Sequence, residues 1–388
     1  MTAETADGQL REALAERTRA LCEEKSPLGE EAALCDRLAR EQAPHWPGAL
    51  ERIGNSLVFG RVSGGRPALV LLGHLDTVPL QAGDFPARRE GGLVFGRGAS
   101  DMKGAVALLL ELFERIGPDE RARLPVEPVV VLYDREEGPY EQSGLGPVLE
   151  QRRDLRNASL ALCLEPTDLG LQIGCCGSMH ATLTFPGRPA HSARPWQGKN
   201  AVHAAGALLS YLESLAPVEK VFAAQATAGA PPAEVVFREV INCTRIEGFT
   251  GRNVLPAACV LNLNYRFAPG RSVASAEAVL QALADRFGAT CAVTDRAPAG
   301  EVALDHPLLA RLRALCGGKV EPKQAWTDVA RLGALGLVAA NFGPGAQAQA
   351  HQRGEHCSEE LLLQGYRILE RLLRQGPAAI DAAPAGRR

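Results

Sequence analysis

The stretch "ALVLLGHLDTVPL", residues 68–80, decides the fold class of this chain. It begins as a continuous apolar run, which is typical of a strand buried on both faces, and it ends in polar residues. Two more apolar runs, "EPVVVLY" (127–133) and "SLALCLE" (159–165), repeat this pattern, and "KGAVALLLELFERIG" (103–117) has the apolar face of a helix. Buried strands that alternate with helices predict an α/β fold, with a mostly parallel sheet flanked by helices.

The sequence pattern changes near residue 178. An alternating strand is followed by a helix, two long alternating strands and a second helix that ends near residue 288. This β-α-β-β-α order predicts a two-layer α+β unit with an antiparallel sheet. We therefore predict two domains, one formed by residues 1–177 and 289–388, and a second one, residues 178–288, inserted into the first.

Composition excludes several classes of function. The 388 residues are 46% hydrophobic, which suffices for a large core, and 42 basic side chains stand against 45 acidic ones. The sequence has no long run of basic residues of the kind that binds nucleic acid. No apolar run approaches the roughly 18–20 residues that span a bilayer. The N-terminus lacks the apolar core of a signal peptide, so we expect a soluble, cytoplasmic protein with no nucleic-acid or membrane partner.

Polar side chains capable of binding metals follow the predicted strands or lie in the loops after them. They are His74 with Asp76, Asp101, Glu136 with Glu137, Glu165 and His351. Two imidazoles with several carboxylates suit two ions of the Zn²⁺ type, which prefer nitrogen and oxygen ligands. Two such ions need about three ligands each, and one carboxylate can bridge them at a separation of roughly 3.5–4 Å.

Each of these residues has a structural interpretation when it is taken alone. A single histidine at a strand end is usually structural, although a carboxylate two residues on, as Asp76 is from His74, can hydrogen-bond the second ring nitrogen of a metal ligand. Asp101, in "GRGASDMKG", could simply cap a helix. Adjacent glutamates such as Glu136 and Glu137 are usually solvated, yet their side chains diverge, so one can bind a metal while the other serves as a base. The metal hypothesis depends on all of these groups meeting on one sheet.

Six segments in order resemble the signature of the dinuclear zinc aminoacylase and exopeptidase family: "GHLDTVP", "GRGASDMKG", "EEG", "LEPT", "GRPAHSAR" and "NFGPG…AH". The resemblance covers nearly the whole chain. It implies a zinc-exopeptidase-like fold, with a mixed, mostly parallel sheet and an inserted dimerisation or lid domain. Within the family, "HSARPWQGKNAVH", "NYRFAP" and "WTDVARL" are similar to segments of succinyl-diaminopimelate desuccinylases.

The resemblance also implies a role for each candidate residue. His74 and Glu165 would bind one zinc, Glu137 and His351 the other, and Asp101 would bridge them, with cobalt or manganese as alternatives in one site. His351 is preferred over His356 because it follows "GPG" at the family's place. The peptide between Asp101 and Met102 is expected to be cis. Glu136 would be the general base and Asp76 would orient His74.

The implied substrate is an N-acyl amino acid, specifically N-succinyl-LL-2,6-diaminopimelate of the lysine pathway. His191 would complete the oxyanion site from the other subunit of a homodimer that forms through the inserted domain. Guanidinium groups bind carboxylates bidentately, which makes arginines good candidates for this substrate. The candidate substrate-binding residues are Asn253, Arg194, Arg266, Thr327, Asp328 and Arg331. Cys175 and Cys176 depart from the pattern, since some desuccinylases carry basic residues there.

Three alternatives remain open. Acetylornithine deacetylase, or another N-acyl amino-acid deacylase or carboxypeptidase of the family, would share the metal site. The segment "SDMK" (100–103) fits the S-x-x-K motif of serine acylases, but the chain has no S-D-N or K-T-G partner. A non-enzymatic relative would be expected to have lost ligands, whereas this chain keeps all of them.

Overall fold

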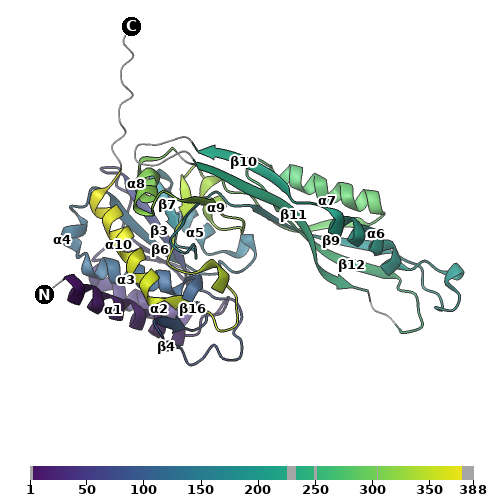
Figure 1. The fold of residues 1–388 in the computed structure, drawn as a ribbon, viewed down its shortest axis with the longest axis horizontal. Coiled ribbons are helices and arrows are strands. Elements are labelled where there is room, and N and C mark those ends of the chain that lie inside the picture. Colours follow the sequence, from purple (N-terminus) through teal and green to yellow (C-terminus); the bar gives the residue numbers. More distant parts are fainter. Residues whose placement is uncertain (1–2, 225–232, 249–250, 304, 378–388) are drawn as a thin grey trace, which may run out of the picture.

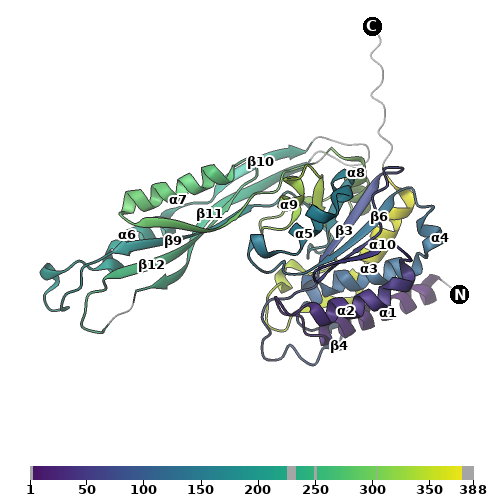
Figure 2. The ribbon, with the colours of Figure 1, turned by 180° about the vertical axis from the view of Figure 1, so that it is seen from behind.

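An eight-stranded sheet forms the centre of the larger of two units (Figures 1 and 2). The computed structural model describes residues 3–224, 233–248, 251–303 and 305–377. In spatial order the strands are β1 (Leu50–Ile53), β2 (Ser56–Phe59), β6 (Glu127–Tyr133), β3 (Ala68–His74), β7 (Leu160–Cys163), β15 (Ala339–Asn341), β8 (Leu171–Ile173) and β14 (Val320–Pro322). Strands β6, β3, β7 and β15 pair in parallel, while β2 joins β6, and β8 joins β15, in antiparallel fashion. The predicted mixed, mostly parallel sheet is confirmed.

Both faces of this sheet are buried, which explains why its central strands are continuously apolar. In β3, Leu69 and Leu71 belong to one hydrophobic cluster, and Val70 and Leu72 belong to another on the opposite face. The first cluster is closed by α1 (Ala3–Glu23), α2 (Ala32–Gln42), α3 (Gly104–Arg115), α8 (Pro307–Leu315) and α10 (Glu359–Gln375). The second is closed by α5 (Leu145–Gln151) and α9 (Val329–Gly333).

The second unit extends from the first as an elongated arm (Figures 1 and 2). Its antiparallel sheet has the order β10 (Val218–Ala224), β11 (Ala233–Glu247), β12 (Ala258–Phe267), β9 (Gly177–Pro186) and β13 (Thr290–Ala297). Alternate residues of β12 are buried against α6 (Ala201–Ser214) and α7 (Val273–Phe287), which cover one face of the sheet. The other face carries polar side chains, so the arm is the two-layer unit that the sequence predicts.

The predicted boundary at residue 288 needs correction. Strand β13 begins after this residue, yet it pairs antiparallel with β9, with Cys291 opposite Leu183. The sheet of the arm therefore runs from Gly177 to Ala297. Neither β10 nor β13 is predicted from the sequence pattern. In β13 the reason is its place at the edge of the sheet, where half-buried residues alternate with exposed ones and give little hydrophobic contrast.

Smaller elements complete the larger unit. A three-stranded sheet joins β16 (His356–Ser358), β5 (Leu93–Phe95) and β4 (Arg88–Glu90), and thereby ties the C-terminal part of the chain to the segment before α3. An irregular helical turn, η2 (Ala99–Lys103), leads into α3, and the short helix α4 (Pro118–Arg121) follows α3. None of the helices within the described ranges is long and apolar enough to cross a membrane.

Candidate metal centre

The predicted metal ligands gather at the carboxyl ends of neighbouring strands, where open α/β sheets place their sites. His74 is the last residue of β3, and Glu165 lies just beyond β7. The pair Glu136–Glu137 follows β6, which is the other neighbour of β3. Asp101 belongs to η2, and His351 lies in the segment after β15. Four separate strand ends and one helical turn thus bring the ligands together.

Two groups of three potential ligands share Asp101. Ligand atoms of His74, Asp101 and Glu165 all lie within 4.8 Å of one another, and so do those of Asp101, Glu137 and His351. The two carboxylate oxygens of Asp101 face different histidines: Oδ1 is 3.2 Å from His74 Nε2, and Oδ2 is 3.5 Å from His351 Nε2. Glu137 Oε1 is 3.0 Å from His351 Nε2. Each group has the number and kind of ligands that a divalent ion needs, with Asp101 between them.

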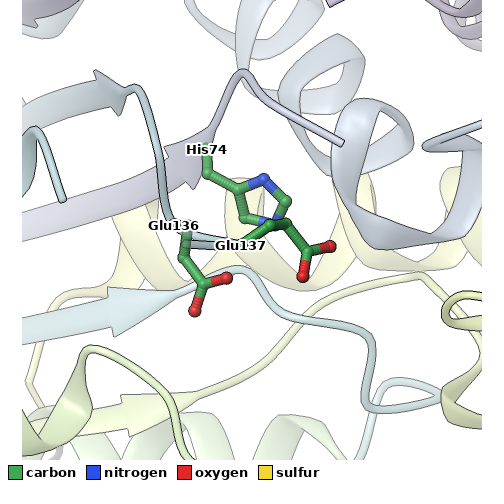
Figure 3. Close-up of side chains that lie close together, drawn as sticks. All are labelled: His74, Glu136 and Glu137. Atoms are coloured by element: carbon green, nitrogen blue, oxygen red, sulfur yellow. The ribbon is translucent and has the colours of Figure 1, made fainter. Parts of the chain in front are cut away.

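Asp76 holds the turn that carries the two glutamates. Its carboxylate accepts hydrogen bonds from the backbone N–H groups of Glu136, at 3.0 Å, and Glu137, at 2.9 Å. The two glutamate side chains diverge from this turn, and their carboxylates lie near His74 (Figure 3). His74 Nδ1 is 3.0 Å from the Asp76 carbonyl oxygen and 3.5 Å from its carboxylate. The backbone carbonyl of Asp76 thus makes the shorter contact with the histidine, while the carboxylate secures the turn.

A second buried carboxylate, Glu355, holds the loop that carries Asp101. Its Oε1 accepts hydrogen bonds from the backbone N–H groups of Ser100 and Asp101, both at 2.9 Å. Its Oε2 accepts one from Gly98 N at 2.9 Å and one from Arg97 Nη1 at 3.2 Å. Glu355 is not predicted from the sequence, because a lone glutamate among polar neighbours has no pattern that marks it.

Unusual backbone geometry occurs at the same edge of the sheet. The peptide between Asp101 and Met102 is cis, as the family resemblance implies. Arg135 and His351 have left-handed backbone conformations, with φ of 59° and 63°. Positive φ is uncommon outside glycine, and residues that adopt it cluster at functional sites. The backbone therefore supports a functional assignment for this edge independently of the side chains.

Negative charge is concentrated in the cluster. Burial, with a further contribution from the neighbouring Asp101, raises the pKa of Glu165 to about 7. Burial also raises the pKa of Glu136 well above its usual range, with a contribution from Glu165. Burial by itself lowers the pKa of His74, but hydrogen bonds with Asp101 and Asp76 more than offset this and raise it well above its usual value. All three pKa values are raised because protonation reduces the excess of negative charge in the site.

The residues present fit a pair of divalent cations. Glu165 Oε1 is buried and has no hydrogen-bond partner within the described part of the chain. Buried polar atoms nearly always have a partner, so this unpaired carboxylate oxygen is available to a cation. Two imidazoles and three carboxylates are the ligands that zinc and its close relatives accept. A cation in each group would satisfy this oxygen and offset the excess of negative charge.

Two cavities meet at the cluster, since both are lined by Glu136, Glu137 and His351. The first has a volume of about 340 Å³ and extends along the segment after β14, past Lys323 and Thr327. The second has a volume of about 320 Å³ and extends to the base of the arm, where it is lined by Ser178, His180, Arg266 and Asp295. Thr327 lines the first cavity and Arg266 the second, so these two predicted substrate-binding residues lie beside the cluster.

Asp328 and Arg331, two more of the predicted substrate-binding residues, form an ion pair with each other. Asp328 is fully buried and its carboxylate accepts hydrogen bonds from Tyr133 Oη at 2.9 Å and Arg331 Nε at 2.7 Å. The Arg331 guanidinium also stacks on the ring of Tyr140 at 3.9 Å. The two charges pair with each other, and neither residue is part of the lining of these two cavities.

Two loops lie at the end of the arm remote from the eight-stranded sheet, one between β9 and α6 and one between β11 and β12 (Figures 1 and 2). The first carries His191 and Arg194, and the second carries Asn253. His191 is joined to the second of these loops by a β-bridge with Val254, and Ser192 N donates a hydrogen bond to the Asn253 carbonyl oxygen at 2.8 Å. None of the three predicted residues is part of the lining of the two cavities described above.

The fold and the site together place this chain in a known class of enzyme. A model of the peptidase family M20/M25/M40 matches residues 70–375, a range that contains all of the candidate ligands. The chain belongs to this family, and it is a metal-dependent hydrolase that acts on an amide bond.

Individual relatives narrow the comparison further. The chain is 36% identical over 344 residues to a putative succinyl-diaminopimelate desuccinylase of Mycobacterium tuberculosis, covering 88% of this chain and 92% of the relative. It is 32% identical over 364 residues to a succinyl-diaminopimelate desuccinylase of Corynebacterium glutamicum, covering 92% and 95%. An acetylornithine deacetylase of Myxococcus xanthus is 29% identical over 332 residues, with 83% of each chain covered.

Solved structures agree with this fold. A tripeptidase of Staphylococcus aureus superposes with a TM-score of 0.73 at 17% identity, covering 94% of this chain and 98% of that one. A dinuclear metal-binding peptidase of the M20 family from Bacillus subtilis superposes with a TM-score of 0.63 at 14% identity, covering 95% and 98%. At these identities the likeness shows the fold.

Proposed function

We propose that this chain removes succinate from N-succinyl-LL-2,6-diaminopimelate as a dinuclear metalloenzyme. The observation that carries the proposal is the pair of three-ligand groups that share Asp101. The extent of the likeness to desuccinylases supports the substrate, because it covers about nine-tenths of both chains. Two cavities of similar size at the cluster suit a substrate that extends in two directions from its amide bond.

Two divalent cations complete the site in this proposal. His74 and Glu165 would hold one, Glu137 and His351 would hold the other, and Asp101, which belongs to both groups, would serve both ions. The nitrogen and oxygen donors favour zinc, with cobalt or manganese as alternatives in one position. When bound, such ions polarise an amide carbonyl and lower the pKa of a water molecule.

Glu136 acts as the general base. It lines both cavities beside the ligand groups, and neither of the two groups that share Asp101 requires it. Burial, together with the nearby Glu165, raises its pKa well above the usual range, which suits a carboxylate that must take up a proton and release it again. Glu136 accepts a proton from the attacking water as the carbon–oxygen bond forms. It returns this proton to the nitrogen of the leaving amine as the carbon–nitrogen bond breaks.

A second copy of the chain supplies His191 in this proposal. His191 and Asn253 lie at the far end of the arm, so they can serve a cavity only on another subunit or after a large movement of the arm. Exposed apolar side chains of the arm support burial in an interface. They are Trp196, Val202, Leu215, Val218, Val221, Ile246 and Val254. We propose that the arm, with Arg194 among its loop residues, is both the dimerisation domain and the lid.

A mixing experiment tests the second subunit. His191→Ala and Glu136→Gln proteins are each expected to be inactive. Their mixture, after exchange of subunits, should regain activity, because a mixed dimer combines Glu136 of one chain with His191 of the other. A mixture that stays inactive despite proven exchange would contradict action across the interface, and a monomer in analytical ultracentrifugation would contradict the dimer.

A substrate panel tests the reaction itself. Zinc-loaded protein is assayed side by side on succinyl-diaminopimelate, acetylornithine and an acyl-glutamate. The first should be hydrolysed with the highest kcat/KM, and preference for acetylornithine would replace the proposed substrate. Glu136→Gln should keep its zinc and lose several orders of magnitude in turnover, whereas equal loss of zinc would contradict the role of base. The exposed Glu141 offers a matched control, since Glu141→Gln changes a neighbouring charge outside both cavities.

We also propose that the protein works in the cytoplasm. All ten cysteines are free thiols, and seven of them are buried. Free thiols in this number fit a reducing compartment.

A further inference from the structure

Lys323 is a buried cation in the wall of the first cavity. It directly follows β14, and the residue is only 6% exposed. Its Nζ donates a hydrogen bond to the Pro166 carbonyl oxygen at 3.3 Å. Within the described part of the chain no carboxylate lies at ion-pair distance from it, although its charge acts on Asp101 and Glu165 of the same cavity. An ammonium group has three donors, and burying one without an anionic partner is costly. Lys323 therefore has the geometry of a binding group for an anion.

Lys323 supplies the one lysine or arginine charge among the described residues that line this cavity. The acidic residues of the lining are Asp101, Glu136, Glu137 and Glu165. Two divalent cations would match the four negative charges of these carboxylates. With the metals bound, the positive charge of Lys323 is left over, and the cavity then favours a ligand that carries a negative charge.

The second cavity offers a different pattern of charge. Arg266 on β12 lies opposite Ser178 of β9, and Asp295 on β13 lies opposite His180, two residues further along β9. Residues directly opposite in an antiparallel pair, and residues two apart along a strand, share one face of the sheet. Arg266 and Asp295 thus line the same cavity. A guanidinium with a carboxylate matches an amino-acid head group, which carries both charges, whereas Lys323 alone matches a single carboxylate.

We infer that Lys323 binds the terminal carboxylate of the succinyl group, and that the first cavity is the acyl subsite. This inference rests on the proposed function. The amide bond divides that substrate into an acyl part with one carboxylate and an amine part that ends in an amino-acid head group. Because the two cavities meet at Glu136, Glu137 and His351, each part of the substrate has one cavity whose charges match it. Lys323 then distinguishes a succinyl group from an acetyl group, which ends in an uncharged methyl.

The kinetic test compares two amides that differ only in the acyl group: N-succinyl- and N-acetyl-diaminopimelate. Lys323→Met removes the charge and keeps the length of the side chain. It should lower kcat/KM for the succinyl substrate roughly 30- to 100-fold, the effect of one hydrogen bond to a charged group, and change that for the acetyl substrate by about twofold or less. Lys319→Met is the matched control, because Lys319 precedes the same strand, pairs with Glu321 and is largely exposed. Equal losses on both substrates, or no loss on the succinyl one, would overturn the inference.

A binding measurement separates this inference from the proposed reaction. Succinate is titrated calorimetrically into the metal-loaded wild type, Lys323→Met, Lys323→Arg and Lys319→Met. Affinity should fall at least about tenfold in Lys323→Met only, since Lys323→Arg keeps the charge and shows whether the position tolerates change. If the wild type hydrolyses neither amide, the proposed function fails while the binding result still decides the role of Lys323. Equal succinate affinity in wild type and Lys323→Met would refute it.

Discussion

Replacing Asp76 by asparagine should loosen the turn that carries Glu136 and Glu137. The Asp76 carboxylate is fully buried, and each of its oxygens accepts one backbone N–H of this turn. An asparagine amide keeps one acceptor oxygen and presents an NH₂ donor in place of the other. One of the two backbone N–H groups therefore loses its partner and faces another donor.

The structure sets the size of this effect. A hydrogen bond to a charged acceptor contributes about 1.5–3 kcal/mol, and a buried N–H left without a partner costs about 1–3 kcal/mol. The two figures describe the same lost hydrogen bond in part, so they are not added. We take about 3 kcal/mol as the change in the free energy of local opening of the turn, which corresponds to roughly a 100-fold change in the opening equilibrium. His74 also loses the negative charge that lies 3.5 Å from its Nδ1. Loss of such support typically weakens metal binding about 10- to 100-fold.

Hydrogen–deuterium exchange over residues 134–141 measures the first effect, and competition with a chelator measures the second. In Asp76→Asn the amides of Glu136 and Glu137 should exchange roughly 100-fold faster, and zinc should bind more weakly. Asp119→Asn, an exposed change on α4, should leave both quantities unaltered. Weaker zinc binding with unchanged exchange would refute the role of the carboxylate in the turn and leave only its effect on His74. No change in either measurement would refute the reasoning as a whole.

The remaining predictions concern stability. Glu355→Ala leaves Arg97 paired with Asp84 alone and removes the acceptor of three backbone N–H groups in the loop of Asp101. The free energy of unfolding should fall by about 3–5 kcal/mol in denaturant titrations, and a fall below about 1 kcal/mol would contradict the role of Glu355 in this loop. Gly177→Ala places a methyl carbon 2.2 Å from the Phe267 ring, so β9 and β12 must shift. The free energy of unfolding should drop by about 1–3 kcal/mol in the same assay, and an unchanged value would contradict this packing. The third prediction concerns pH. The pKa of Glu165 is raised to about 7, so below that pH the metal-free folded protein holds a proton that the unfolded chain releases at lower pH. Stability of the metal-free protein should therefore fall as pH rises from about 5 to about 7.5, and zinc, which needs the carboxylate, should raise the melting temperature more at the higher pH; the opposite trend would contradict the assignment.

The strand ends of the central sheet are readable from the sequence for a physical reason. A strand buried on both faces must be apolar throughout, so the first polar residues after it mark its carboxyl end. His74, the pair Glu136–Glu137 and Glu165 are such residues, and they meet because their strands are neighbours in a parallel arrangement. The edge strand β13 lacks this contrast, since solvent covers one side of it, and its pattern resembles that of a polar loop.

Partners that are distant in the sequence could not be predicted in this way. Asp328 would look the same in the sequence whether its carboxylate faced a cavity or, as the structure shows, Tyr133 and Arg331. Glu355 and Lys323 are single charged residues outside any periodic pattern. Their roles depend on which backbone groups or cavities the folded chain brings to them, and only the three-dimensional arrangement contains that information.

The position of β15 has a consequence for how the protein is made. This strand lies between β7 and β8 in the sheet, although the whole arm separates it from both along the chain. On the ribosome, β7 is complete long before β15 exists, so one of its edges stays unpaired while the arm is being synthesised. An unpaired edge can recruit a strand from another chain. The segment after β15 also brings His351, so the sheet closes and the ligand set becomes complete at the same late moment of biogenesis.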